Sequence, residues 1–187
     1  MKHRLAGLAL LALCLLCTLP FVPASSQQAP DPNNTLVIEL KTGRVLIKLR
    51  PDLAPGHVKR VKNLAKEGFY DGLTFHRVIP GFMAQTGDPT GTGAGGSDLP
   101  NLKAEFSNEA HKRGTVSAAR SGNPDSANSQ FYICFDDAPW LDRQYSVWGE
   151  VVEGMDHVDA IKKGGEHNNG AISGEPDKIV KARIEAD

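Results

Sequence analysis

Between residues 74 and 152 the chain consists mainly of short β-prone runs, and this pattern constrains the fold more than any other feature. The runs are 74–78, 82–86, 115–119, 131–135 and 146–152. Gly, Pro, Asn and Asp lie between them, and these residues favour turns over longer elements. Short strands separated by turn formers are typical of antiparallel sheets. The pattern therefore predicts a mainly β protein.

The segment before these runs predicts a hairpin and a helix. Two β-prone runs, Thr35–Leu40 and 45–49, flank a turn that ends at Gly43. Pro55 can open a helix, and Gly68 can end it. One apolar stripe lies between them, formed by Val58, Val61, Leu64 and Ala65. We expect a second, shorter helix over 155–163, and the balance of elements favours a closed antiparallel barrel with two helices.

The N-terminal residues have the pattern of a secretory signal. Lys2 and Arg4 form a basic head, an apolar run follows over 5–19, and small residues stand near Ala24. We predict a signal peptide over 1–24, a flexible polar linker over 25–34 and one domain over 35–187. An uncleaved signal would instead tether the protein to a membrane, although the apolar run is shorter than the roughly 20 residues of a spanning helix.

Charge and cysteine content exclude some classes of function. The net charge is −1, without a basic face, so we expect no nucleic-acid partner. Removal of the predicted signal would leave Cys134 as the one cysteine, so no intramolecular disulfide could form. Cys134 lies in the apolar run 131–135, where a cysteine normally packs as a small hydrophobic residue.

Two segments carry the pattern that points to a function. The first, FHRVIPGFMAQTGD over 75–88, places Arg77 among aromatic, thioether and amide side chains. The second begins at Ser117 and supplies Gln130, Tyr132 and Trp140. Together they closely resemble the cyclophilin signature, and the resemblance extends from about residue 35 to residue 180. It implies a peptidyl-prolyl cis-trans isomerase folded as an eight-stranded closed antiparallel β-barrel capped by two α-helices.

The resemblance also implies the residues of the site. Arg77 matches the arginine that donates a hydrogen bond to the prolyl nitrogen during rotation, so it is the candidate catalytic residue. The implied substrate-binding residues are Phe82, Met83, Gln85, Ala119, Arg120, Gln130, Tyr132, Trp140, Leu141 and Tyr145. Four of them, Phe82, Met83, Tyr132 and Leu141, would hold the proline ring.

The reaction makes and breaks no covalent bond, so the site needs no nucleophile. Rotation about a prolyl bond takes about 10–100 s without a catalyst, and bringing it to a millisecond requires roughly 5.5–7 kcal/mol. One charge-assisted hydrogen bond contributes about 1.5–3 kcal/mol. Arg77 therefore cannot act alone, and an apolar pocket must contribute the rest.

Three positions differ from the commonest eukaryotic pattern. Tyr132 stands where phenylalanine is usual, Arg120 replaces an asparagine, and Tyr145 replaces a histidine. The last two resemble bacterial members. Trp140 is the residue type associated with binding of cyclosporin-class inhibitors, so we expect such binding, with an affinity that these differences alter.

Neither a cofactor nor a metal is predicted. Residues 91–96 match G-x-G-x-x-G, but proline and turn formers flank them where a dinucleotide site needs a strand and a helix. We therefore expect a flexible glycine loop at the rim of the barrel. The six histidines are scattered without the spacing of metal ligands.

The leading hypothesis is an exported, monomeric isomerase that acts on X-Pro bonds of unfolded or partly folded proteins. A bacterial periplasm is favoured because the motif resembles bacterial members and the sequence ends Ile-Glu-Ala-Asp187, without a retention signal. The alternative is a non-catalytic chaperone module that holds proline-containing segments, since Tyr132 would narrow the proline pocket.

Overall fold

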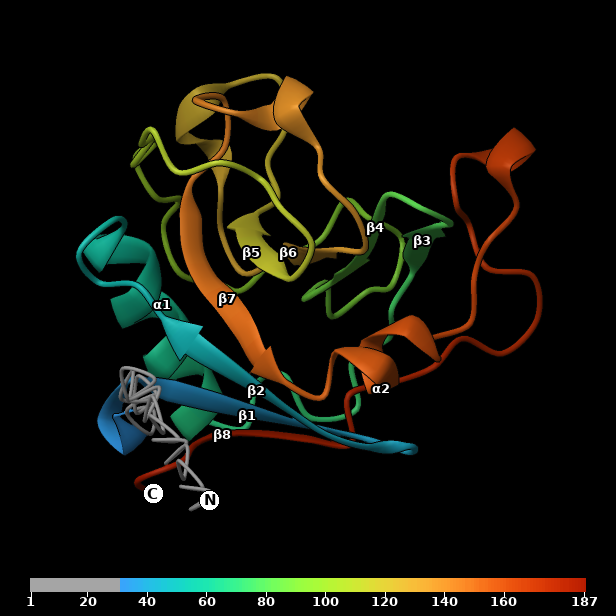
Figure 1. The fold of residues 1–187 in the computed structure, drawn as a ribbon, viewed down its shortest axis with the longest axis horizontal. Coiled ribbons are helices and arrows are strands. Elements are labelled where there is room, and N and C mark those ends of the chain that lie inside the picture. Colours follow the sequence, from blue (N-terminus) through green and yellow to red (C-terminus); the bar gives the residue numbers. More distant parts are fainter. Residues whose placement is uncertain (1–30) are drawn as a thin grey trace, which may run out of the picture.

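Eight strands form one antiparallel sheet in the computed structural model, which describes residues 31–187 (Figure 1). The predicted signal at 1–24 and most of the predicted linker lie outside the described residues. The strands are β1 (Thr35–Leu40), β2 (Gly43–Leu49), β3 (Arg77–Ile79), β4 (Met83–Thr86), β5 (Thr115–Ala118), β6 (Phe131–Cys134), β7 (Val147–Glu153) and β8 (Lys181–Ile184). Their order across the sheet is β3-β4-β6-β5-β7-β2-β1-β8. The prediction of a mainly β protein is confirmed.

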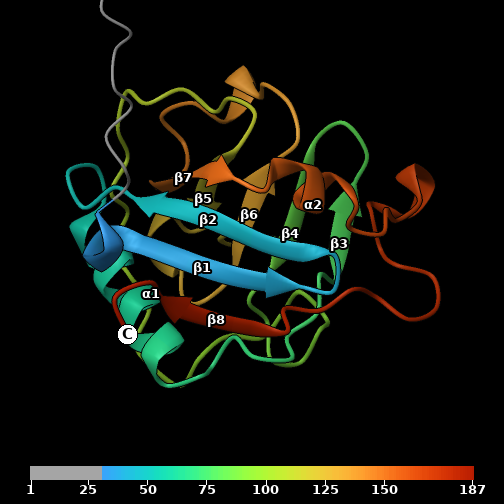
Figure 2. The same ribbon diagram turned by 60° about the horizontal axis from the view of Figure 1, so that its bottom comes forward.

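The helices are few and short. The α-helices are α1 (Pro55–Lys66) and α2 (Met155–Asp159), and short 3-10 turns occupy Pro32–Asn34, Pro124–Ser126, Pro139–Leu141 and Glu166–Asn168. Figure 2 shows α1 at one end of the curled sheet and α2 towards the other. The predicted hairpin is confirmed, because β1 and β2 pair in register from Thr35 opposite Lys48 to Leu40 opposite Gly43.

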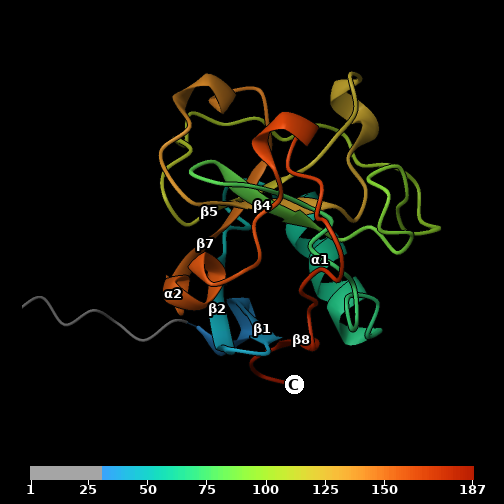
Figure 3. The same cartoon turned by 90° about the vertical axis from the view of Figure 1, so that its right-hand side faces the viewer.

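The sheet curls but does not close, so the prediction of a closed barrel is wrong. Its two edge strands, β3 and β8, do not pair with each other. Figure 3 shows β8 at the bottom of the molecule, away from β4, the strand that pairs with β3. Instead, Val78 of β3 accepts a hydrogen bond from the N–H of Gly164 and donates one to the carbonyl of Gly170, both at 2.8 Å. A loop between α2 and β8 therefore uses the free edge of β3 and leaves an open half-barrel.

The helix α1 forms as its apolar stripe predicts, since Val58, Val61, Leu64 and Ala65 are all buried. Ala54 supplies no side-chain cap. The Glu105 carboxylate, distant in sequence, accepts hydrogen bonds from the first N–H groups of the helix, those of Gly56 at 2.9 Å and His57 at 3.0 Å. An acceptor with negative charge at this end also suits the helix dipole. This cap ties α1 to the loop before β5.

The second helix is shorter than predicted. It ends at Asp159, whereas the sequence pattern extends it to residue 163. The N–H of Lys162 donates to the Asp177 carboxylate at 2.8 Å, and the N–H of Gly164 donates to Val78. These bonds to neighbouring segments replace the bonds that would continue the helix.

Side chains of the central strands alternate between two apolar clusters. Phe131 and Ile133 of β6 face the main core inside the curled sheet, together with Trp148 and Phe75. Tyr132 and Cys134 of the same strand face a smaller cluster on the outer surface, with Met83, Ala138 and Leu141. Because side chains alternate along a strand, one face of β6 packs in the main core and the other face packs in the outer cluster.

No helix within residues 31–187 combines the length and apolar character needed to cross a bilayer.

Candidate active site

A cavity of about 150 Å³ opens on the outer face of β4 and β6. A volume of this size accommodates a small ring such as benzene in other proteins. Its lining residues are Arg77, Phe82, Met83, Gln85, Ala119, Arg120, Tyr132, Leu141 and Tyr145. The structure therefore gathers nine of the eleven residues that the sequence pattern proposed. The remaining two lie close by, because Gln130 bonds to Gln85 and Trp140 packs against Phe82.

Strand pairing explains how residues distant in sequence meet at this cavity. Arg77 lies opposite Gln85 in the β3–β4 pair, and Gln85 lies opposite Tyr132 in the β4–β6 pair. Residues that pair directly across neighbouring strands point to the same face of a sheet. An arginine, an amide and an aromatic ring are thus set side by side by the register of three strands.

Arg77 is held by three hydrogen bonds from its guanidinium group. Nη1 donates to Oε1 of Gln85 at 3.1 Å, Nε donates to the carbonyl of Asn169 at 3.1 Å, and Nη2 donates to Oδ1 of Asn169 at 2.8 Å. A guanidinium has five N–H donors, so two remain free for another acceptor. Burial lowers the pKa of Arg77, but an arginine stays charged at neutral pH. The Arg77 guanidinium is therefore fixed in position and keeps two N–H groups for a substrate acceptor.

A chain of amides fixes Gln85 in turn. Its Nε2 donates to Oε1 of Gln130 at 2.8 Å. Nε2 of Gln130 donates to the carbonyls of Gly93 at 3.0 Å and Gly95 at 2.7 Å. Each amide thus donates with its nitrogen and accepts with its oxygen. This series of hydrogen bonds begins at the two glycine carbonyls, passes through Gln130 and Gln85, and ends at Arg77.

Asp88 anchors the glycine loop at 91–96 that supplies those two carbonyls. The buried Asp88 carboxylate accepts from four backbone N–H groups, those of Thr90, Thr92, Gly93 and Gly95. Desolvation opposes ionisation, but the hydrogen bonds outweigh it and lower the pKa of Asp88 to about 2. The loop is therefore organised around a charge and continues the amide chain that leads to Arg77.

The walls of the cavity are apolar and aromatic. Met83, Tyr132 and Leu141 are nearly fully buried. At the rim, the Trp140 ring lies 5.6 Å from that of Phe82 and is 58% exposed. A mostly buried floor with an exposed aromatic rim suits an apolar ring on an extended chain.

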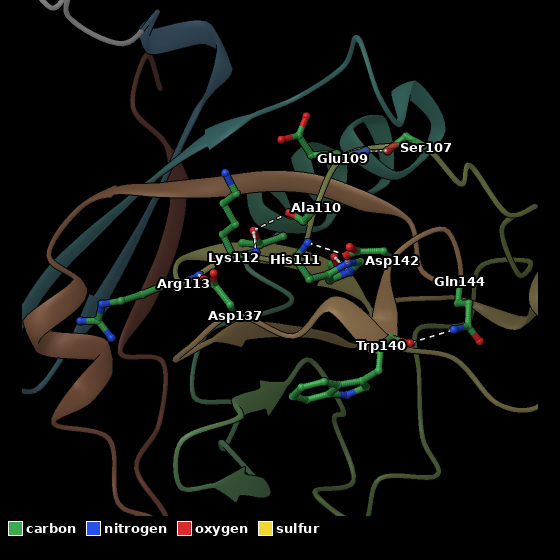
Figure 4. A network of polar contacts seen from close by, with 12 residues as sticks. Ser107, Glu109, Ala110, His111, Lys112, Arg113, Asp137, Trp140, Asp142 and Gln144 are labelled. Atoms are coloured by element: carbon green, nitrogen blue, oxygen red, sulfur yellow. Dashed lines mark hydrogen bonds and ion pairs between the residues drawn. The ribbon is translucent and has the colours of Figure 1, made fainter.

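A polar network lies behind the cavity, on the far side of Tyr132. The His111 ring stacks on Tyr132 with centroids 6.3 Å apart. Its Nδ1 lies 3.0 Å from Oδ1 of Asp142, and its Nε2 lies 3.0 Å from Oγ of Ser117. Figure 4 shows His111 and Asp142 facing each other, with Trp140 set apart from the pair.

The protonation state of this network follows from its partners. Burial lowers the pKa of His111, although Asp142 opposes that effect. A neutral ring must carry its proton on Nδ1, because the Asp142 carboxylate can only accept. Nε2 then accepts from the Ser117 hydroxyl. Ser117 is completely buried, so this serine-histidine-aspartate arrangement supports the pocket floor and is inaccessible to a substrate.

Cys134 lies beside the pocket floor and does not have the properties of a nucleophile. Burial raises the pKa of its thiol to about 12, so the thiol is neutral. The described part of the chain contains no group of three or more His, Cys, Asp or Glu side chains placed to hold a metal ion.

Asn169 is the main site residue that the sequence pattern missed. It lies in the loop before β8 and adopts a positive φ of 57°, which presents both its carbonyl and its side chain to Arg77. A conformation of this kind is uncommon for residues other than glycine, and asparagine tolerates it best. The Asn169-Gly170 pair is a turn signal in the sequence, but nothing local to it indicates contact with Arg77.

Comparisons with known proteins point to one family. The family model described as "Cyclophilin type peptidyl-prolyl cis-trans isomerase/CLD" matches residues 35–184. A "Probable peptidyl-prolyl cis-trans isomerase" of Brucella suis biovar 1 (strain 1330) is 54% identical over 188 residues, which cover 95% of each chain. A "Peptidyl-prolyl cis-trans isomerase" of Helicobacter pylori (strain ATCC 700392 / 26695) is 44% identical over 131 residues, covering 68% of this chain and 79% of the relative.

Solved structures show the same similarity. The crystal structure of cyclophilin AquaCyp293 from Hirschia baltica superposes with a TM-score of 0.75 at 29% identity, covering 84% of this chain and 76% of that one. A Cryptosporidium parvum cyclophilin type peptidyl-prolyl cis-trans isomerase, crystallised in the presence of the dipeptide Ala-Pro, gives a TM-score of 0.72 at 26% identity. That match covers 80% of this chain and 98% of the other.

Proposed function

This chain belongs to the cyclophilin-type peptidyl-prolyl cis-trans isomerases, and from that premise we propose that the cavity beside Arg77 is where the X-Pro bond rotates. The observation that carries the proposal is a fixed cation with two unused N–H donors at the edge of a buried apolar pocket. Phe82, Met83, Tyr132 and Leu141 would hold the proline ring, as expected from the sequence.

The proposed mechanism uses the change in the prolyl nitrogen during rotation. In the planar amide its lone pair is delocalised, and the barrier to rotation is about 18–20 kcal/mol. As the bond twists, the lone pair localises on nitrogen and can accept a hydrogen bond. Arg77 would donate to it in the twisted state and much less in either planar state, which is the condition for lowering a barrier.

The polar network around Arg77 would keep the guanidinium in place during this step. Asn169 and Gln85 hold three of its N–H groups, so little reorganisation is needed when the bond twists. The apolar walls would exclude water and strengthen the interaction between the guanidinium and the nitrogen. Ala119 and Arg120 follow β5 and would lie along the substrate backbone.

The binding-only alternative is not favoured. It depended on Tyr132 narrowing the pocket, yet the Tyr132 hydroxyl oxygen is buried and Tyr132 as a whole is only 5% exposed. The cavity beside it keeps a volume of about 150 Å³. The relatives that match along the chain carry the isomerase name, in agreement with a catalytic pocket.

Three finer aspects of the function remain part of the proposal. We propose that residues 1–24 direct export to the periplasm, where a monomer would act on unfolded or partly folded chains, and that the exposed Trp140 would contact cyclosporin-class inhibitors. The mass of the exported protein checks the first aspect, because cleavage would remove about 24 residues, whereas a tethered form would keep them.

Exchange NMR on a proline peptide tests catalysis directly. The full chain is added in substoichiometric amount to a peptide with resolved cis and trans signals. A catalyst increases the exchange rate between the two signals in proportion to its concentration. A protein that only binds would shift signals without increasing the exchange rate, and that result would contradict the proposal.

A further inference from the structure

Arg120 lies on the wall between the proline cavity and a second cavity. The second cavity has a volume of about 380 Å³ and shares Gln85, Ala119 and Arg120 with the first. Its other lining residues are Gly93, Ala94, Gly95, Ser121, Ser126, Asn128 and Gln130. A chain bound with its proline in the first cavity would place a neighbouring residue at or across this wall.

The Arg120 guanidinium is held as firmly as that of Arg77. Nε and Nη2 donate to the carbonyl of Gln144 at 3.1 and 2.9 Å, and Nη1 donates to the carbonyl of Ser121 at 2.8 Å. These bonds use three of its five N–H donors, and two remain. Its acceptors are neutral carbonyls, so its positive charge is not cancelled by them.

Two aromatic rings lie beside the same group. The guanidinium carbon lies 4.6 Å from the ring centroid of Tyr145 and 5.9 Å from that of Phe106. Tyr145 in turn packs edge-on against Tyr132, with centroids 5.8 Å apart. Arg120, Tyr132 and Tyr145, the three positions that differ from the commonest eukaryotic pattern, therefore form one contact cluster. Within it, the Tyr145 ring packs against the guanidinium of Arg120, the residue that replaces an asparagine.

The charges lining the two cavities have one sign. Arg77 and Arg120 are the cations, and no Asp or Glu occurs among the residues that line either cavity in the described part of the chain. A bound segment that carries a carboxylate would be attracted at this surface, and a segment that carries a lysine would be repelled.

We infer that Arg120 gives this isomerase a preference for acidic substrates, in which a carboxylate lies within two residues of the proline. The inference rests on the proposed function, because it takes the proline into the cavity beside Arg77. The two free N–H donors of Arg120 suit the two oxygens of a carboxylate. Arg120 acts here as a specificity residue, and Arg77 remains the residue that contacts the rotating bond.

The test compares matched proline peptides that carry Glu or Gln at one position: two residues before the proline, directly before it, or directly after it. The full chain is assayed at low ionic strength. We expect kcat/KM to be about two- to fivefold higher for Glu than for Gln at one or more of these positions, as suits a partly exposed ion pair. The preference should fall towards one in about 1 M salt, where the screening length is about 3 Å.

Two variants assign the preference to Arg120. In Arg120→Gln the ratio of kcat/KM for Glu over Gln should fall to about one. In Arg183→Gln, which removes an equal charge from the edge strand β8, the ratio should stay at its native value (Figure 1). Arg120→Lys should retain part of the preference, because it keeps the charge and loses the planar fork.

The outcomes separate this inference from the proposed function. Turnover of every peptide at equal kcat/KM for Glu and Gln would overturn the inference and leave the isomerase activity intact. A preference that survives in Arg120→Gln would overturn it as well, since another cation would then be responsible. Absence of turnover with all peptides would overturn both.

Discussion

Asn169 binds Arg77 twice, through its carbonyl to Nε at 3.1 Å and through its side-chain oxygen to Nη2 at 2.8 Å. The two residues are 92 positions apart in the sequence. Gln85 holds a third donor of the same guanidinium. Arg77 is therefore positioned from two sides, by the strand paired with its own and by the loop that occupies the edge of β3.

Asn169→Gly should lower kcat/KM by roughly tenfold, which corresponds to about 1.4 kcal/mol. Glycine tolerates the positive φ of this position, so the variant removes the side-chain bond without adding backbone strain. The measurement is kcat/KM with the urea unfolding curve recorded in parallel. Asn168→Gly, one residue earlier in the same loop, is the control and should retain its activity. Equal activity of both variants would show that the Asn169 side chain does not position Arg77.

Acid should destabilise the protein through Asp88. Its folded-state pKa of about 2 lies below its ordinary value of 3.8, so its contribution to the free energy of unfolding is fully present above pH 4. The contribution, on the order of 2 kcal/mol, is lost as the pH falls from about 4 to about 2. Urea unfolding curves recorded at several pH values measure this loss.

Asp88→Asn tests the assignment of that acid sensitivity. The variant should be less stable at pH 6, because a neutral amide replaces a carboxylate that accepts four backbone N–H groups. Its stability should also change less than that of the native protein between pH 4 and pH 2. A variant that keeps the full native pH dependence would show that other carboxylates cause the acid sensitivity.

Removal of the Tyr132 hydroxyl should stabilise the fold. The hydroxyl oxygen is buried and makes no hydrogen bond of ordinary geometry to the described residues, and such a group costs about 1–3 kcal/mol. Tyr132→Phe should therefore raise the free energy of unfolding by about 1 kcal/mol, measured in urea. Tyr145→Phe removes a hydroxyl from a half-buried neighbour and serves as the control. A loss of stability in Tyr132→Phe alone would mean that the hydroxyl is bound in solution.

The elements that the sequence predicted are those in which local pattern and final contacts agree. The stripe on α1 matches the burial observed for its residues, and the apolar residues of the two predicted β-prone runs are buried in β1 and β2. The strand β8 was missed, although its alternation of buried Ala182 and Ile184 with exposed or half-buried neighbours is visible in the sequence. It is only four residues long and contains two basic residues, so its signal is weak.

The open edge of the sheet and the contacts of Asn169 could not be predicted, because both depend on long-range hydrogen bonds. The hydrogen bonds of Gly164 and Gly170 to Val78 join residues far apart in the chain. The periodic pattern of apolar residues in a sequence does not indicate contacts of this kind. The cap that Glu105 provides for α1 is of the same kind. In contrast, the resemblance supplied the cavity residues, and strand register brought them together.

The Arg77→Lys variant tests whether a positive charge at this position is sufficient for isomerase activity. Lysine keeps a positive charge, but its single ammonium group cannot bind Gln85, both acceptors of Asn169 and a substrate nitrogen in one plane. We expect this variant to lose most of the activity that Arg77→Ala loses. Activity close to that of the native protein would show that a point charge replaces the guanidinium.

The central claim is that Arg77 donates to the prolyl nitrogen as the bond rotates. The most direct measurement is kcat/KM of Arg77→Ala for a neutral proline peptide, with a urea unfolding curve to establish that the variant is folded. Loss of one charge-assisted hydrogen bond of about 1.5–3 kcal/mol predicts a fall of about 10- to 150-fold. A folded Arg77→Ala protein with native kcat/KM would contradict the claim.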